Sequence, residues 1–256
     1  MKQPPISVVI ICKNAAATLV ATIEAAQQVS SDIIVLDSGS TDGSQDIVQA
    51  TTARLLERPW VGYGPTKNAG NEAARHDWIL SIDADECIDE TLAQAIQKID
   101  FSNATKAYAL KRLNYLGQQP IHFGEWKNDW VVRLFNRQYI KWNDALVHET
   151  LIVPPTISVE KLEGVLHHYT TTDIDSYNKK LEAYAQLMAE RYYKQGKKAG
   201  PIKKYASSTF SFLKHYVLEL GCLDKRAGWQ IAVAHASYTF KKYQQLEWLH
   251  KKTHQA

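Results

Sequence analysis

Three acidic side chains stand directly after an apolar run at positions 78–86. The run from Trp78 to Ile82 does not alternate with polar residues, which is typical of a strand buried on both faces of a parallel sheet. Asp83, Asp85 and Glu86 cannot continue such a strand, because burying an unpaired carboxylate costs several kcal/mol. We therefore expect the acids at the carboxyl end of the strand, where open α/β sheets bind their ligands.

Asp83 and Asp85 have a spacing that allows them to share one divalent cation. Carboxylate oxygens are ligands that Mg²⁺ and Mn²⁺ prefer, and a cation held there could also bind a diphosphate. The alternative is a helix start, because four acids between positions 85 and 90 would favour the first turn of a helix predicted over 90–99. The acids alone leave both interpretations open.

The preceding segments predict the elements that position these acids. Continuous apolar runs predict buried strands over 6–12 and 32–37, and a helical pattern follows each of them. Strands alternating with helices at this pace indicate an α/β chain with a parallel sheet. Asn14 follows the first strand and Asp37 ends the second, so we expect both to gather with the acids along one edge. Asp37 is not needed as a helix cap, because the loop after it offers other cap residues.

Lys67 and Asn68 lie near the start of a helix predicted over 66–75, which is rich in small residues that allow close packing on a sheet. Lys67 could contact a phosphate there, and Asn68 could hydrogen-bond a ligand. A solvated surface charge is an equally good interpretation of Lys67.

Aromatic and ionisable residues recur between positions 122 and 169. The segment His122–Trp130 lacks periodicity and is predicted to be a loop at a functional site. Aromatic rings stack on sugar faces, and carboxylates take protons from hydroxyl groups, so this segment favours a carbohydrate ligand. The recurring residues are Glu125, Trp126, Asp129, Trp130, Trp142, His148, Glu149 and His168.

From Asp173 onward the pattern predicts helices, over 176–193, 202–220 and 226–249. An amphipathic helical subdomain packed on the sheet explains each helix by itself. Their combined Lys and aromatic content predicts, as the alternative, peripheral contact with an anionic membrane.

Composition narrows the class of protein. The 256 residues carry a net charge of +3, too small to imply nucleic acid as a partner. Three distant cysteines argue against a disulfide framework and fit a reducing compartment. We expect no signal peptide and no membrane-spanning helix, and hence a cytoplasmic protein, with the peripheral membrane contact at the cytoplasmic face.

The motifs together resemble family 2 glycosyltransferases, which use nucleotide sugars. The resemblance rests on Ser7–Ile10 with Asn14, on Ile34–Asp42, and on Asn68 through Asp85, in that order. It implies an α/β protein with a GT-A type, Rossmann-like, mostly parallel sheet flanked by helices. The expected domains are a glycosyltransferase domain over 1–172, with a nucleotide-sugar half (about 1–100) and an acceptor half (about 101–172), and a C-terminal helical subdomain over 173–256.

The second half of the chain is similar to lipopolysaccharide inner-core β-1,4-glucosyltransferases. The similarity rests on Trp126–Asp129 with Arg133–Phe135, on Val147–Glu149, on His168-Tyr169, and on the stretch 216–243. It implies inverting transfer of a hexose, glucose from UDP-glucose, to a heptose of a lipid-linked acceptor. Alternatives are a capsule, another glycan or a peptide as acceptor, and, in another class, a non-catalytic sugar-nucleotide-binding module.

The resemblance assigns roles to individual residues. Asp37 would read the uracil, Asp83 would lie near the ribose or the metal, and Asp85 would hold Mg²⁺ or Mn²⁺ on the diphosphate. Many family members have two acids where this chain has Asp37-Ser38, so one carboxylate remains for the nucleotide. The candidate donor-binding residues are Cys12, Asn14, Asp37, Lys67, Asn68, Asp83 and Ala84, and the candidate metal ligands are Asp85, Asp83 and His148.

The catalytic base is not fixed by the family pattern, because the usual Glu-Asp pair is not evident. Inversion needs a carboxylate that takes the proton of the acceptor hydroxyl opposite the leaving diphosphate. We place Asp129 slightly ahead of Glu149, whose His148-Glu149 pair could instead bind metal or acceptor. Glu125 is the third candidate, and the candidate acceptor contacts are Trp126, Trp130 and Arg133.

Overall fold

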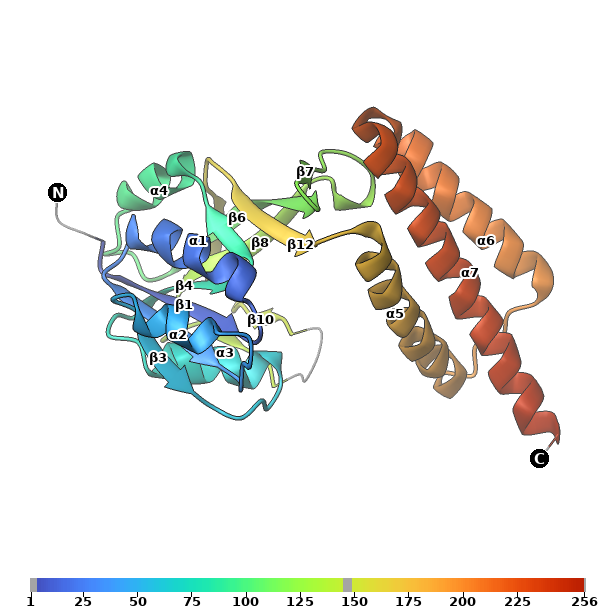
Figure 1. Ribbon diagram of the computed structural model, residues 1–256, viewed down its shortest axis with the longest axis horizontal. Coiled ribbons are helices and arrows are strands. Elements are labelled where there is room, and N and C mark those ends of the chain that lie inside the picture. The colour runs from blue at the N-terminus through green and yellow to red at the C-terminus, as the bar shows by residue number, and fades with distance from the viewer. Residues whose placement is uncertain (1–3, 145–148, 256) are drawn as a thin grey trace. The chain divides into compact units, whose positions relative to one another are not determined.

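A computed structural model describes residues 4–144 and 149–255, without the side chains of the last three (Figure 1). By their contacts these residues form two compact units, which we call unit 1 and unit 2. Unit 1 takes the chain up to Arg112 and again Asp129–His168, whereas unit 2 takes Leu113–Asn128 and the chain from Tyr169 onward. The chain therefore passes from unit 1 into unit 2 twice.

The first part of unit 1 alternates strands and helices. Four strands lie side by side in the order β3-β2-β1-β4, and their parallel pairing confirms the predicted parallel sheet. The elements are β1 (Ile6–Cys12), α1 (Ala16–Gln27), β2 (Asp32–Asp37), α2 (Ser44–Gln49), β3 (Arg54–Glu57), α3 (Tyr63–Glu72) and β4 (Trp78–Asp83).

Antiparallel strands continue the sheet beyond β4. β8 pairs with β4 and with β6, and β12 pairs with β5, so the described part of the chain forms one mixed sheet of ten strands. These elements are β5 (Glu86–Ile88), α4 (Glu90–Gln97), β6 (Lys106–Leu116), β7 (Gln119–Pro120), β8 (Asp129–Asn136), β11 (Ser158–Lys161) and β12 (Leu166–Thr171); β9 (Lys141–Trp142) and β10 (Leu151–Ile152) pair separately. The predicted α/β class is confirmed.

Apolar strand residues and small helix residues build the core of unit 1. Every residue of β1 and β2 is buried, as expected for strands covered on both faces. Gly70 of α3 allows the helix to approach the sheet, because a Cβ there would lie 2.4 Å from Val9 Cγ1 and 2.7 Å from Leu36 Cδ1. The close packing that the small residues of this helix predicted is confirmed.

Unit 2 consists of the C-terminal helices and of the segment Leu113–Asn128, which we call the insertion. The buried carboxylate of Asp224 accepts hydrogen bonds from the backbone N–H groups of His122 (3.1 Å) and Phe123 (2.8 Å), and it fastens the insertion to the helices. No helix within the described residues is both long enough and apolar enough to cross a bilayer. The elements are η1 (Gly124–Trp126), α5 (Ile174–Lys194), α6 (Pro201–Leu213), the π-helical turn η2 (Lys214–Leu218), η3 (Gly221–Asp224) and α7 (Lys225–Gln255).

Several predicted boundaries differ from the structure. α3 begins three residues before the predicted start, because Pro65 is accommodated in its first turn. Glu86 belongs to β5 and Asp89 is the residue that caps α4, so the helix-start interpretation is wrong for Asp85 and Glu86. The helix predicted over 202–220 ends at Leu213 and passes into η2.

The two compact units divide the chain differently from the predicted domains, whose boundary is after residue 172. The second passage into unit 2 lies between His168 and Tyr169, but Leu113–Asn128 also belongs to unit 2 and not to an acceptor half of the first domain. The predicted loop His122–Trp130 is divided by the same boundary, because Asp129 and Trp130 open β8.

Candidate active site

The polar residues that follow the parallel strands meet at one edge of the sheet. Cys12 at the end of β1 lies in register with Asp37 at the end of β2, and its neighbour Ile11 lies in register with Asp83 of β4. The gathering expected from the sequence is therefore confirmed. Cys12 itself is buried, and burial raises the pKa of its thiol, so it lines this edge as a neutral side chain.

The loop after β2 is organised by the Asp37 carboxylate. This carboxylate accepts hydrogen bonds from the N–H groups of Gly39 (3.0 Å) and Ser40 (2.9 Å) and from Gln45 Nε2 (2.7 Å). Burial alone would raise the pKa of Asp37, but these hydrogen bonds outweigh it and lower the pKa. Asp37 thus shapes its own loop, a role that the cap argument from the sequence did not assign to it.

Asn14 joins the loop after β1 to the loop after β2. Its backbone N–H donates to Ser40 Oγ (2.8 Å), and its side-chain Oδ1 accepts from the N–H of Thr41 (2.8 Å). The residue has a φ of 51°, a left-handed conformation that Asn tolerates better than most residues. The two loops at the carboxyl edge therefore form one hydrogen-bonded structure.

Asp83 lies between two cations at the centre of this edge. Lys67 Nζ is 3.0 Å from Asp83 Oδ1, and Arg133 donates from Nη2 to Asp83 Oδ2 at 3.0 Å. Burial would raise the pKa of Asp83, but the charges of Lys67 and Arg133 hold it well below its usual range. Asp83 is therefore a permanently ionised acceptor that is already paired with cations.

Glu86 extends this pairing to β6 and to the start of β8. It is fully buried and accepts from Arg133 Nη2 (2.7 Å) and Arg112 Nη1 (3.2 Å). Arg112 in turn donates from Nε to Asp129 Oδ2 at 2.8 Å. Glu86 and Arg112 were not among the predicted site residues. Glu86 was noted only as a helix-start acid, and its burial depends on strands that are distant in the sequence.

Alternating charges thus run through the site, which we call the charge chain. Four carboxylates alternate with three cations, so the charge chain has one more negative charge than positive charges. Its order is Glu149, Lys67, Asp83, Arg133, Glu86, Arg112 and Asp129.

Of the two predicted metal ligands within the described residues, Asp85 is the one that remains accessible to a cation. Its side chain is 37% exposed, and His168 Nε2 lies 3.6 Å from its Oδ2. Asp83 is already compensated by Lys67 and Arg133, so it fits a divalent cation less well than Asp85 does. An exposed carboxylate suits a hard divalent cation whose other ligands are oxygen atoms of a diphosphate.

Lys67 and Asn68 both fix the structure around Trp142. Lys67 is 1% exposed and its Nζ lies 4.5 Å from the centre of the Trp142 ring, so the surface-charge interpretation of Lys67 is wrong. The Asn68 side chain donates to Trp142 O (2.9 Å) and accepts from Trp142 N (3.0 Å). Ala84, another candidate donor contact, is buried and its carbonyl accepts from Thr18 (2.8 Å) and Thr22 (3.0 Å).

The three candidate bases lie in different surroundings. Asp129, 26% exposed, and Glu149, 18% exposed, stand at the two ends of the charge chain. Glu125 belongs to unit 2, where its Oε2 is 2.9 Å from His215 Nδ1. His148, proposed as a metal ligand, lies outside the described residues.

The candidate acceptor contacts are also divided between the units. Arg133 is buried in the charge chain, and Trp130 of β8 has Lys161 Nζ 4.6 Å from the centre of its ring. Trp126 lies in unit 2 and packs edge-on against Tyr177, with 5.2 Å between ring centres.

Comparison with known proteins decides the family. The model of the family "Glycosyl transferase family 2" matches residues 7–151, which include both loops and every member of the charge chain. The chain belongs to this family. The resemblance inferred from the motifs is confirmed, and this family 2 protein is a transferase of glycosyl groups with the GT-A type of α/β fold.

Relatives of this glycosyltransferase extend the match beyond the family model. An uncharacterised glycosyltransferase of Rickettsia prowazekii is 27% identical over 225 residues, which cover 83% of this chain and 76% of that one. The lipopolysaccharide core biosynthesis glycosyltransferase LpsC of Rhizobium meliloti is 28% identical over 222 residues, covering 83% and 80%. Among solved structures, S. aureus TarS 1–349 aligns with a TM-score of 0.47 and 12% identity, covering 97% and 91%.

Proposed function

We propose that this protein transfers glucose from UDP-glucose to a heptose of the lipopolysaccharide inner core, with inversion at the anomeric carbon. The similarity to LpsC over 83% of the chain carries the proposal for lipopolysaccharide core synthesis. Membership of family 2 and the charge chain at the carboxyl edge support a nucleotide-sugar donor. The choice of glucose and of uridine follows the motif resemblance alone.

At the donor, we assign the cation to Asp85 with His168. A bound Mg²⁺ or Mn²⁺ would supply positive charge against the diphosphate that leaves. Asp83, kept ionised by Lys67 and Arg133, would accept hydrogen bonds from hydroxyl groups of the donor. Asp37 fixes the conformation of the loop that would surround the uracil base of the donor.

At the acceptor, we assign the base to Asp129. Its carboxylate takes the proton of the acceptor hydroxyl while that oxygen bonds the anomeric carbon and the bond from this carbon to the diphosphate oxygen breaks. Arg112 fixes the orientation of Asp129 through the 2.8 Å hydrogen bond to Oδ2. No covalent nucleophile is required, because inversion takes one displacement.

A donor panel tests the proposal directly. Thermal unfolding is measured with Mn²⁺ and each of several nucleotide sugars, because a ligand bound only by the folded state raises the melting temperature by mass action. UDP-glucose with Mn²⁺ should stabilise most, and transfer to a heptose-terminated core acceptor should follow. Asp85→Ala should abolish the cation dependence of both measurements. Equal stabilisation by all donors, or turnover unchanged in Asp85→Ala, would contradict the donor assignment.

The alternatives predict other outcomes of the same experiments. Transfer to a capsule, another glycan or a peptide, but not to a heptose, would contradict the proposed acceptor and leave the proposed donor site unchanged. Donor binding without any transfer or donor hydrolysis would favour a non-catalytic sugar-nucleotide-binding module.

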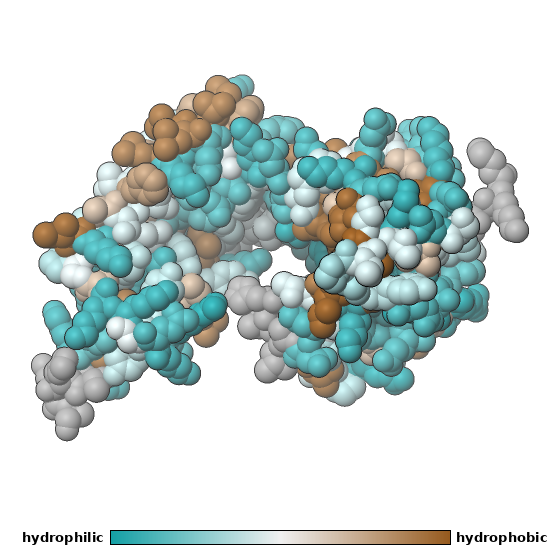
Figure 2. Space-filling view, turned by 180° about the vertical axis from the view of Figure 1, so that it is seen from behind, coloured by the Kyte–Doolittle hydropathy of each residue, from teal (hydrophilic) through white to brown (hydrophobic). Residues whose placement is uncertain are grey.

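We also propose that unit 2 contacts an anionic membrane that carries the lipid-linked acceptor, at its cytoplasmic face. Hydrophobic side chains gather along one edge of unit 2, where α6 passes into η2 and η3 (Figure 2). We call these residues the apolar edge: Phe210, Leu213, Val217, Leu218, Leu220 and Leu223, with side chains between 43% and 70% exposed. The exposed cations Lys214, Lys225 and Arg226 stand beside them in the chain, a combination that fits anionic lipids.

A further inference from the structure

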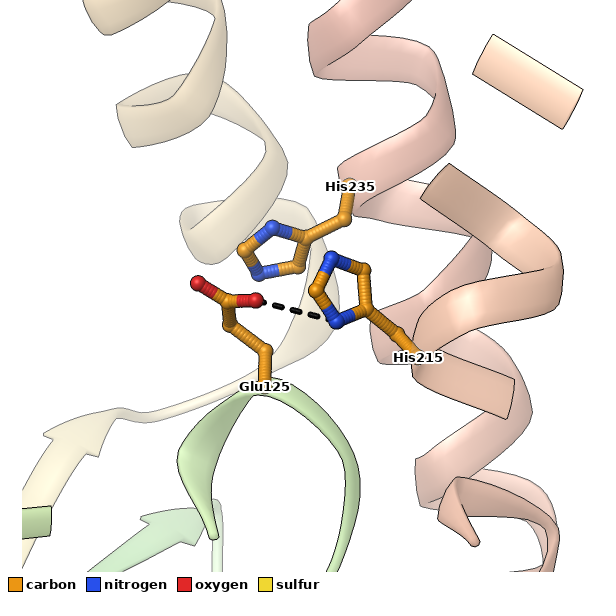
Figure 3. Close-up of side chains that lie close together, drawn as sticks. All are labelled: Glu125, His215 and His235. Atoms are coloured by element: carbon orange, nitrogen blue, oxygen red, sulfur yellow. Dashed lines mark ion pairs between the residues drawn. The ribbon is translucent and has the colours of Figure 1, made fainter. Parts of the chain in front are cut away.

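Two histidines and a glutamate of unit 2 converge, and none of them belongs to the charge chain. Glu125 comes from η1, His215 from η2 and His235 from α7, and their polar ends point toward one another (Figure 3). Each offers one ligand atom, and these atoms all lie within 4.8 Å of one another. No other group of three His, Cys, Asp or Glu residues within the described residues meets this distance.

Further side chains hold both imidazoles in place. Tyr177 Oη lies 2.8 Å from His235 Nε2, and Glu219 Oε2 lies 2.7 Å from His215 Nδ1. Partners of this kind orient histidines that bind metals, because they fix the ring and its tautomer. Both partners belong to unit 2, so the whole arrangement is contained in one compact unit.

The backbone around His215 is shaped to bring these elements together. His215 lies in the π-helical turn η2, and single π-turns within helices frequently occur at functional sites. Gly124 has a φ of 68°, and a Cβ at Gly221 would lie 2.5 Å from the carbonyl oxygen of His215. Larger residues at these two positions would therefore disturb the approach of the insertion and of η3 to η2.

An ion-pair network without metal would explain only part of the cluster. Glu125 and Glu219 both reach His215 Nδ1, at 2.9 Å and 2.7 Å, which accounts for a charged His215. These ion pairs do not include His235, whose Nε2 lies 2.8 Å from Tyr177 Oη and whose ring centre is 5.2 Å from that of His215. Two imidazoles and a carboxylate whose ligand atoms lie within 4.8 Å of one another are the donor set of His₂Glu zinc sites.

We propose that Glu125, His215 and His235 bind a divalent transition-metal ion, with Zn²⁺ as the ion that their chemistry favours. Ligand atoms around Zn²⁺ lie about 3.3 Å apart when each bond is about 2.0 Å long, so small side-chain rotations close the site. The ion connects the insertion, η2 and α7 within unit 2. The proposed zinc site shares no residue with the cation site proposed at Asp85, and it does not depend on the reaction proposed for unit 1.

Zinc binding is measured on the full chain with Asp85→Ala, which removes the other candidate cation site. After treatment with EDTA, the protein is titrated with ZnCl₂ by calorimetry, and bound zinc is counted by elemental analysis after dialysis. One equivalent should bind, and the melting temperature should rise with zinc. Glu125→Gln and His235→Asn should each abolish the stoichiometric binding. Glu219→Gln and Tyr177→Phe should weaken it by about 10- to 100-fold.

His122→Ala is the matched control, because this exposed histidine lies on the same insertion, and it should bind zinc like the parent protein. Binding of less than one equivalent of zinc by the Asp85→Ala chain, which is the parent of the other variants, would overturn the proposal. Unchanged affinity in Glu125→Gln or His235→Asn would overturn it too. Should His235→Asn fail to fold, judged by circular dichroism without metal, Tyr177→Phe decides in its place, and unchanged zinc affinity in that variant counts against the site.

Discussion

At the scale of single residues, the side chains of the candidate active site hold one another in place through ion pairs. Each cation of the charge chain contacts two carboxylates. Only the carboxylates at the two ends have a single partner within the charge chain. Asp129 and Glu149 occupy those ends and retain exposed area, which is what a base that meets an acceptor requires.

Replacing Asp129 by Asn should lower kcat by about 10²- to 10⁴-fold, the usual contribution of a general base. The affinity for UDP-glucose should stay nearly unchanged, because the amide keeps the shape of the carboxylate and Arg112 keeps its bond to Glu86. Steady-state kinetics and donor titration measure the two effects. Glu149→Gln is the matched variant at the other end of the charge chain. A larger loss of kcat in Glu149→Gln than in Asp129→Asn would move the base to Glu149.

Replacing Lys67 by Met should destabilise the protein by about 2 kcal/mol. The buried ammonium compensates Asp83 and Glu149, and breaking a fully buried pair costs roughly 3–5 kcal/mol, whereas these carboxylates retain some exposure. Urea unfolding measures the change. The exposed Lys13→Met should stay within about 0.5 kcal/mol of the parent protein. Equal stability of the two variants would show that Lys67 does not hold the charge chain.

At the scale of elements, the site depends on how closely α3 lies against the sheet. Gly70 sets this distance, and Lys67 and Asn68 reach Trp142 from the same helix. A shift of α3 would therefore move two members of the site together.

Replacing Gly70 by Ala should cost about 1–3 kcal/mol, because the new methyl group overlaps Val9 and Leu36. Gly200→Ala is the control, since a Cβ there would have no atom within 4 Å. Urea unfolding compares the two, and kcat/KM should fall in Gly70→Ala but not in Gly200→Ala. Unchanged stability of Gly70→Ala would mean that the sheet yields to α3 without cost.

Sequence patterns predicted the elements best where hydrophobic burial alone determines the structure. The strands at 6–12 and 32–37 have the predicted bounds, because uninterrupted apolar runs leave no other buried element. The turn η2 could not be predicted, because a π-helical turn has no periodic signature in the sequence. Asp37, Asp83 and Asp85 were predicted from their places at strand ends, whereas Glu86 and Arg112 enter the site only through pairings with distant strands.

At the scale of the whole molecule, the residues assigned to the reaction come mostly from unit 1. Asp85, Asp83 and Asp129 all belong to unit 1, whereas the apolar edge and the proposed zinc site belong to unit 2. We therefore expect chemistry and membrane contact to be separable by mutation.

Replacing Leu218 and Leu223 together by Ser should reduce binding to vesicles of anionic phospholipid by about 10-fold or more. Both side chains are exposed, at 70% and 55%, and burying a Leu side chain fully contributes about 1.5–3 kcal/mol. Cosedimentation measures binding, which should also weaken as salt is added. Leu187→Ser, equally exposed on α5, is the control. Absence of binding by the parent protein at all salt concentrations would remove the membrane proposal.

The double passage of the chain into unit 2 limits how this protein can be dissected. A fragment that stops after residue 168 would keep Leu113–Asn128 but lose Asp224 and the α7 residues that cover its apolar side chains. Leu116 and Ile121 would then face water, so such a fragment should aggregate. A fragment that contains unit 1 alone requires the removal of both Leu113–Asn128 and the chain from Tyr169 onward, with a short linker from Arg112 to Asp129.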